Sequence, residues 1–270
     1  GVGAVLFAGL LCHMPMVYSN WGRYTQLAGQ AILPAGAWLT WAALDDPGHA
    51  GRRAALIALV VGGLALTHYR ILLFYGFFVL ALLLVAVRER SGQRLMRHLA
   101  GAGAGSLILF LPWFWATYGT VVQQMFVIEI TTPADQTLAQ LQEYNQIGDL
   151  RSFLSPLAWL LLVVGLGLGL WERRRGMLLL AVWWLLLLIV TNPGWFSLPG
   201  TGIISNYALF IAAYLPAAVA AGYLAARLLA LAGRRRWLPA LAALLAVSLG
   251  LWGVGQRAGD VDPGSHALVT

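Results

Sequence analysis

One stretch constrains the fold more than any other: two apolar segments joined by a polar tip and flanked at both ends by arginines. Residues 54–66 and 71–87 are apolar, and Thr67-His68-Tyr69-Arg70 joins them. Arginines precede the first segment at positions 52 and 53 and follow the second at 88, 90, 94 and 97. Arginine-rich flanks stay on the cytoplasmic side of a membrane, so the chain is expected to cross the bilayer twice between them. The sequence therefore predicts a helical hairpin whose extracytoplasmic tip carries His68, Tyr69 and Arg70.

The first arm of this hairpin is short for a membrane span. Residues 54–67 cover about 21 Å at ~1.5 Å per residue, whereas the hydrocarbon core is about 30 Å thick. We therefore expect the tip to lie below the outer surface. A histidine, a phenol and a guanidinium at that depth are costly unless they line a hydrated cavity or meet a partner. The tip is the first candidate site.

The rest of the chain has the same apolar character. Of its 270 residues 60% are apolar and 10% are charged, which is typical of a polytopic membrane protein. Seven further spans are expected, at residues 2–18, 25–44, 100–117, 153–171, 177–190, 207–231 and 237–254. The predicted fold is an all-α transmembrane bundle of about nine spans that forms a single domain over residues 1–270. The first run has no basic segment before it, so we interpret the chain as a fragment lacking N-terminal spans.

The arginines support this topology. All 17 basic residues are arginines, and thirteen of them fall on the predicted cytoplasmic side, with only Arg23, Arg70, Arg151 and Arg257 outside. The net charge of +7 thus orients the protein in its membrane, and nucleic acid is not an expected partner. The expected localisation is the bacterial inner membrane, crossed several times, with the lipid bilayer as a partner.

Residues 118–152 form the one long extracytoplasmic connection. Within it, Thr132-Pro133-Ala134-Asp135 places a capping residue, a proline at the first helical position and an acid in the first turn. Leu138, Leu141 and Tyr144 follow at helical spacing. The pattern predicts an amphipathic helix on the outer membrane face.

Three outer-side groups suit a phosphate or pyrophosphate, namely Arg23, His68 and Arg70. A guanidinium offers paired donors to an oxyanion, and an imidazole can add a third. Tyr69 could assist. The alternative interpretation is that the arginines extend to lipid headgroups, that His68 bonds a backbone carbonyl, and that Tyr69 anchors the interface.

Other residue types give weaker signals. Among the acids of the long loop, Glu129 is the hardest to explain structurally and is a weak candidate for a general base. The chain has one cysteine, Cys12, so a multi-cysteine metal site is excluded. No cofactor motif is evident, and a divalent metal stays open. His13 is expected to be a buried residue without a role. The pairs Gly101 with Gly105 and Gly165 with Gly169 predict close helix packing.

Two stretches carry a resemblance: residues 20–27, Asn-Trp-Gly-Arg-Tyr-Thr-Gln-Leu, and residues 66–70, Leu-Thr-His-Tyr-Arg. With the outer amphipathic segment, they resemble the membrane part of bacterial GT-C glycosyltransferases, multi-span enzymes that use polyprenyl-phosphate sugars. In that family a catalytic Asp or Glu lies in the first outer loop. Here that loop carries Arg23 and no matching acid, so the catalytic residue is unassigned, which fits a fragment.

The resemblance implies inverting sugar transfer on the extracytoplasmic face. Arg23, His68, Tyr69 and Arg70 would bind the lipid-linked sugar phosphate, and the helix from Thr132 would cover the site. The alternative is a multi-span transporter or lipid flippase without enzymatic activity, whose pathway needs polar groups continuing to the cytoplasmic side. The spans after residue 153 hold almost no ionisable residues at mid-depth, which disfavours ion coupling. A structural membrane subunit is the third possibility.

Overall fold

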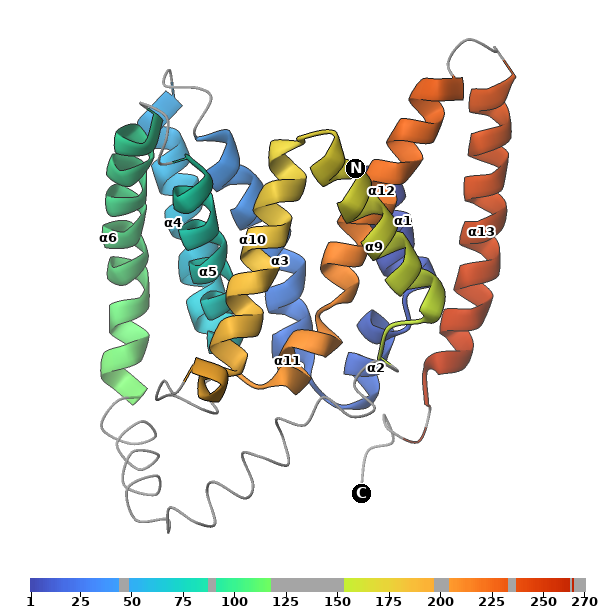
Figure 1. The fold of residues 1–270 in the computed structure, drawn as a ribbon. Coiled ribbons are helices and arrows are strands. Elements are labelled where there is room, and N and C mark those ends of the chain that lie inside the picture. The colour runs from blue at the N-terminus through green and yellow to red at the C-terminus, as the bar shows by residue number, and fades with distance from the viewer. Residues whose placement is uncertain are drawn as a thin grey trace. The chain divides into compact units, whose positions relative to one another are not determined.

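The computed structural model describes residues 1–43, 49–86, 91–117, 153–196, 204–232, 237–262 and 264. Every regular element in these ranges is helical (Figure 1), so the predicted all-α class is confirmed at that level. The predicted loop of residues 118–152, with its amphipathic helix and Glu129, lies outside the described residues.

The helices occur in the following order along the chain: α1 (Val2–Leu6), the π-helical η1 (Phe7–Leu11), α2 (Met14–Asn20), α3 (Tyr24–Ala42), α4 (Ala50–Thr67), α5 (Tyr69–Ala86), α6 (Ser91–Thr117), α9 (Pro156–Trp171), α10 (Arg175–Thr191), the 3-10 turn η5 (Pro193–Phe196), α11 (Asn206–Ile211), α12 (Tyr214–Ala232) and α13 (Leu238–Asp260). Two helices begin earlier than the apolar pattern predicts. Because arginine is a good helix former, α4 includes Arg52 and Arg53, and α6 runs through the basic segment that precedes residue 100.

Two helices are long and apolar enough to cross a membrane, Met96–Thr117 and Asn206–Leu231. A third candidate is the pair Val2–Leu11 and Met14–Asn20, which bends by 44° at its break. The break follows from Pro15, which has no N–H to donate to the carbonyl four residues earlier. These helices support a membrane protein with transmembrane helices. The expected total of about nine spans stays a prediction.

The chain divides into two compact units. The first contains Gly1–Leu27, Ile147–Trp184 and Asn206–Thr270, and the second contains Ala28–Gln146 and Leu185–Ser205. The single domain over residues 1–270 stays a prediction.

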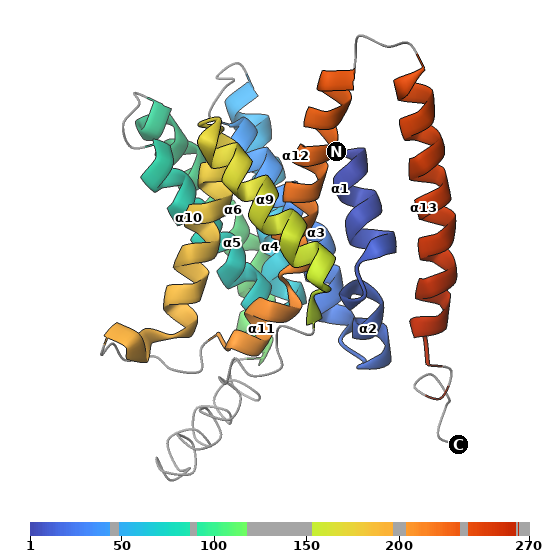
Figure 2. The same ribbon diagram turned by 45° about the vertical axis from the view of Figure 1, so that its right-hand side comes forward.

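In the first unit, α12 packs against α9 and α1, and α13 lies beside α12 (Figures 1 and 2). Glycines allow the close contacts. A Cβ on Gly165 of α9 would lie 2.8 Å from the carbonyl oxygen of Ala220 in α12, and one on Gly222 would lie 2.9 Å from the Cβ of Ala4. The predicted packing role of Gly165 is therefore confirmed.

In the second unit, α4 and α6 pack face to face. A Cβ on Gly105 would lie 2.9 Å from the Cβ of Ala58, and Ser106 donates a hydrogen bond of 3.1 Å to the carbonyl oxygen of Ala58. The predicted packing role of Gly105 is therefore confirmed. The hairpin of α4 and α5 has its break at His68, where the sequence predicts the tip.

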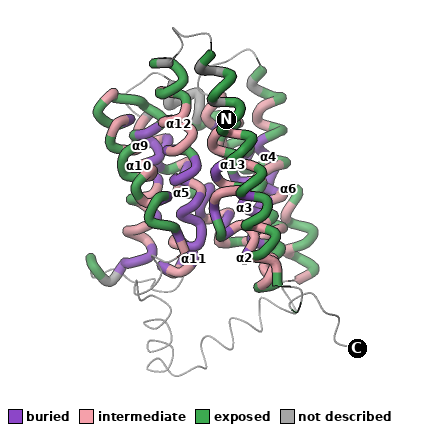
Figure 3. Tube along the Cα trace, turned by 90° about the vertical axis from the view of Figure 1, so that its right-hand side faces the viewer, coloured by how far each residue is buried: buried purple, intermediate pink, exposed green. Residues whose placement is uncertain are grey.

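The helices differ in how far their residues are buried (Figure 3). In the candidate span Asn206–Leu231, 56% of the most apolar window is buried, against 11% for Met96–Thr117. Exposed apolar side chains on α6 and α13 include Ile108, Trp115, Leu244 and Leu251. Such a surface suits lipid contact.

Candidate functional site

Arg23 lies in a tight connection between α2 and α3 whose backbone is fixed by hydrogen bonds. Gly22 has φ of +64°, a left-handed conformation that favours glycine. The Gly22 N–H donates to the carbonyl of Ser19 at 3.1 Å, and the Arg23 N–H donates to that of Tyr18 at 3.0 Å. This is the Schellman pattern that ends a helix. The Leu27 N–H then bonds the Arg23 carbonyl at 3.0 Å, so α3 starts directly after Arg23.

The Arg23 guanidinium lies over two aromatic rings. Its central carbon is 5.5 Å from the centroid of Trp21 and 5.1 Å from that of Tyr207. Phe153 completes the cluster, with its ring centroid 5.9 Å from Trp21 and 5.5 Å from Tyr207, edge to face in both cases. Trp21 and Tyr207 therefore contact the guanidinium at distances where cation–π attraction operates, and Phe153 packs against both rings.

The edges of this guanidinium are available. Within the described ranges, no side chain or carbonyl accepts a hydrogen bond from the Arg23 guanidinium, and no carboxylate pairs with it. Stacking uses the faces of the planar group, and the N–H donors lie in its plane. The group can therefore stack and bind an oxyanion at once.

The second candidate group lies at the break between α4 and α5. His68 is extended, with φ of −161° and ψ of 112°, and its ring stacks on Tyr69 at 5.7 Å with an interplanar angle of 4°. The Arg70 Nε donates to the Tyr69 hydroxyl at 2.9 Å, and its guanidinium carbon is 5.4 Å from that ring centroid. His68, Tyr69 and Arg70 thus form one contiguous group, as their sequence adjacency implies.

Arg23 belongs to the first unit, and His68, Tyr69 and Arg70 belong to the second. Each group is therefore described within its own unit. Their joint use of one ligand stays a prediction.

The structure brings together a polar cluster that sequence reasoning missed. His13 Nδ1 lies 3.1 Å from Asp260 Oδ2, and Arg257 Nη1 lies 2.7 Å from the same oxygen. Asn20 Nδ2 donates to the Asp260 carbonyl at 2.6 Å, and the Asp262 N–H donates to Asn20 Oδ1 at 3.1 Å. The last helix is thereby attached to the residues just before Arg23.

The expectation that His13 is buried is wrong. Its side chain is 54% exposed. The helix break at Cys12 redirects the chain, because Cys12 is extended with φ of −91° and ψ of 135°, and His13 then precedes α2. Two signals could have found this cluster: Pro15, which disfavours a continuous helix through His13, and the charged residues Arg257 and Asp260 after the last apolar run.

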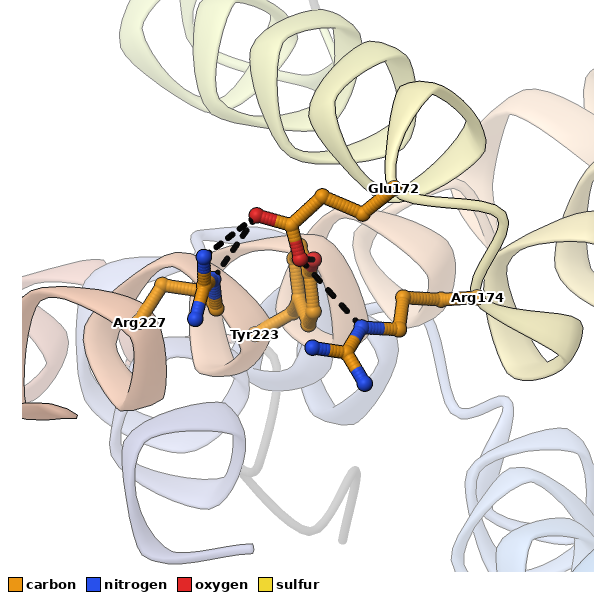
Figure 4. A network of polar contacts seen from close by, with 4 residues as sticks. All are labelled: Glu172, Arg174, Tyr223 and Arg227. Atoms are coloured by element: carbon orange, nitrogen blue, oxygen red, sulfur yellow. Dashed lines mark hydrogen bonds and ion pairs between the residues drawn. The ribbon is translucent and has the colours of Figure 1, made fainter.

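A second polar network, at the turn between α9 and α10, involves Glu172 (Figure 4). Its carboxylate accepts hydrogen bonds from the Tyr223 hydroxyl at 2.6 Å, from Arg227 Nε at 2.9 Å and from Arg174 Nε at 3.2 Å. The bond from Tyr223 chiefly, and those from Arg227 and Arg174, lower the pKa of Glu172 below its ordinary value. Since both oxygens are occupied, this network fastens the turn to α12.

The comparisons with known proteins give one family. The family of unknown function DUF6541 matches residues 1–194. The chain belongs to this family. No curated protein and no solved structure matches it.

In this DUF6541 protein, the matched range contains His13, Arg23 and residues 68–70, whereas Arg257 and Asp260 lie after it. No group of three or more His, Cys, Asp or Glu side chains in the described part of the chain could hold a metal ion. The first unit thus has a stacked guanidinium at Arg23 and a His–Asp pair, and the second unit has a stacked guanidinium at Arg70.

Proposed function

We propose that this DUF6541 protein is a multi-pass enzyme of the bacterial inner membrane that transfers a sugar from a polyprenyl-phosphate donor to an acceptor on the extracytoplasmic face. The observation that supports this most is the guanidinium of Arg23, which lies over Trp21 and Tyr207 and whose N–H donors bond no acceptor in the described part of the chain. Two parallel N–H groups match two oxygens of a phosphate, which a lysine could not do.

The proposed topology has about nine spans. Each expected span coincides with a helix or with consecutive helices, including the short apolar helices Tyr69–Val85, Pro156–Trp171 and Arg175–Thr191. The arginine distribution then assigns the connection at Arg23 and the break at His68 to the same extracytoplasmic side. In this arrangement both cationic groups would meet a lipid phosphate at the outer interface.

Each group has a distinct role in the proposal. Arg23 and Arg70 bind the phosphate of the donor, and His68 and Tyr69 support Arg70 through the stacked rings and the hydroxyl. Cover of the site by the segment starting at Thr132 stays a prediction, because that segment lies outside the described residues.

The test is equilibrium binding of fluorescent polyprenyl phosphate to the full-length protein in detergent. Arg23→Ala should weaken binding about 10- to 100-fold, because a charge-assisted hydrogen bond contributes ~1.5–3 kcal/mol and 1.4 kcal/mol corresponds to tenfold. The affinity of Arg23→Lys should lie between those of Arg23→Ala and the wild type, since lysine keeps the charge and loses the paired donors. Arg97→Ala, at an exposed position of α6 on the predicted cytoplasmic side, is the matched control.

Transfer is then measured with radiolabelled polyprenyl-phosphate hexoses and pentoses and a membrane extract as the source of acceptor. Sugar transfer that is lost in Arg23→Ala and in Arg70→Ala supports the proposal. Equal binding by Arg23→Ala and Arg97→Ala would remove the phosphate assignment. Tight binding with movement of the lipid across vesicles, and no transfer, would identify a flippase instead.

A further inference from the structure

His13 and Asp260 form a His–carboxylate pair at ion-pair distance. Asp260 Oδ2 lies 3.1 Å from Nδ1 of His13, and the contact lacks the alignment of a hydrogen bond. A neutral imidazole carries its hydrogen on one nitrogen, and the neighbouring carboxylate favours Nδ1 for it. The other ring nitrogen, Nε2, then has its lone pair available. The His13 side chain is 54% exposed, which leaves this nitrogen open to a reactant.

The carboxylate of this pair is held more firmly than the ring. Asp260 has a side chain only 19% exposed, and Arg257, itself 15% exposed, lies 2.7 Å from its Oδ2 one helical turn earlier in α13. Asn20 binds the Asp260 backbone at 2.6 Å. A carboxylate at ion-pair distance stabilises an imidazole when the ring becomes charged.

The packing of α13 against η1 also helps to position Asp260. Gly253 of α13 meets the backbone of η1 so closely that a Cβ there would lie 2.6 Å from the carbonyl oxygen of Leu10. Only glycine permits this approach. Leu10 precedes His13 by three residues and Gly253 precedes Asp260 by seven, so this contact brings together the two chain segments that carry the pair. The charged groups that face the ring are Asp260 and, behind it, Arg257, while the neighbouring Cys12 is buried and free.

The cluster adjoins the candidate phosphate site. Asn20, which bonds Asp260 and the Asp262 N–H, is followed directly by Trp21, Gly22 and Arg23. All of these residues belong to the first unit. His13 and Arg23 therefore lie beyond opposite ends of the short helix α2.

We propose that His13, paired with Asp260, is the general base that deprotonates the acceptor hydroxyl; this inference rests on the sugar transfer proposed above. Nε2 takes the hydroxyl proton as the acceptor oxygen forms a bond to the anomeric carbon. The bond between that carbon and the phosphate oxygen breaks, and its electron pair leaves with polyprenyl phosphate. The imidazolium, paired with Asp260, afterwards releases its proton to water.

This role differs from a structural ion pair in its consequences. An exposed ion pair contributes about 0–1 kcal/mol to stability, so removing His13 costs the fold little. General base catalysis contributes about 10²- to 10⁴-fold in rate. His13→Gln, which keeps a side-chain donor for Asp260, should therefore lower transfer within that range while its thermal unfolding and its affinity for polyprenyl phosphate stay as in the wild type.

The experiment compares His13→Gln, His13→Ala, Asp260→Asn and the control His49→Gln in the full-length protein, with the radiolabelled donors and the membrane extract as acceptor. His13→Ala should regain activity with added imidazole, and His49→Gln should transfer as the wild type does. Asp260→Asn should retain donor binding and show an intermediate loss, with an altered pH profile of transfer.

The outcomes separate this inference from the proposed function. If the wild type transfers sugar and His13→Gln transfers it equally well, the assignment of the base is overturned and the proposed function stands. If His13→Gln no longer binds polyprenyl phosphate and imidazole does not restore the activity of His13→Ala, then His13 has a structural role. That result also overturns the inference. A wild-type protein that transfers none of the sugars contradicts the proposed function itself.

Discussion

Glu172 is the most heavily hydrogen-bonded carboxylate among the residues described, and its bonds explain its acidity. It receives donors from Tyr223, Arg227 and Arg174, and these lower its pKa. A carboxyl whose pKa is lower in the folded state than in the unfolded state stabilises the fold at pH above its ordinary value. This contribution is lost as the pH falls through the lowered pKa.

A pH-dependent stability difference follows. Glu172→Gln should melt at a lower temperature than the wild type at neutral pH, because an amide cannot accept both arginines as a carboxylate does. The difference in Tm should shrink as the pH falls below the ordinary carboxyl pKa of about 4.3, where Glu172 of the unfolded chain becomes protonated, and it should be lost below the lowered pKa of the folded state. Thermal unfolding in detergent at several pH values measures it. A Tm difference that is the same at neutral and at acidic pH would contradict this account.

At the residue scale, the sequence predicted which side chains carry charge but not what they meet. Arg23 was identified from its position in an outer loop, and its stacking on Tyr207 was not foreseeable, because the two residues are far apart in the chain. His13 was misjudged for the same reason. Its partner Asp260 follows at the far end of the last helix, and apolar periodicity carries no information about which helix ends meet.

At the scale of elements, the contact of α9 with α12 depends on Gly165. A Cβ there would lie 2.8 Å from the Ala220 carbonyl oxygen, whereas a Cβ on Gly167 of the same helix would have nothing within 4 Å. Gly165→Ala should therefore destabilise the first unit, by about 1–3 kcal/mol as for other overpacked sites. Gly167→Ala should be neutral or stabilise by up to ~1 kcal/mol, since alanine favours helix.

The measurement for this pair is thermal unfolding of both variants alongside the wild type. Equal melting temperatures for Gly165→Ala and Gly167→Ala would show that the two helices do not pack as described.

The helices themselves were largely predictable. Long apolar runs bounded by arginines indicate where membrane helices lie, and each run expected within the described ranges falls on helix. The starts of α4 and α6 were predicted too late, because charged residues end an apolar run while the helix itself continues through them. The π-helical η1 and the extended Cys12 are local distortions that the apolar pattern does not encode.

At the scale of the whole molecule, the arginine distribution predicts which ends of the helices face the cytoplasm. Single cysteines introduced into a Cys12→Ala background at Gly51, Gly176 and Gly255 test it, because a Cβ at each of these positions has open space around it. An impermeant maleimide should label Gly255→Cys in intact cells, and the other two only after permeabilisation. Labelling of Gly51→Cys and Gly255→Cys from the same side would contradict the topology.

The central claim is that a lipid-linked phosphate binds at the extracytoplasmic cations, and photo-crosslinking tests it most directly. A photoreactive polyprenyl phosphate is activated on the full-length protein in membranes, and the labelled peptides are identified by mass spectrometry. We expect label on the peptides that contain Arg23 and Arg70, suppressed by excess polyprenyl phosphate. Label confined to the arginine clusters of the predicted cytoplasmic side, or label at Arg23 that excess polyprenyl phosphate does not suppress, would contradict the account.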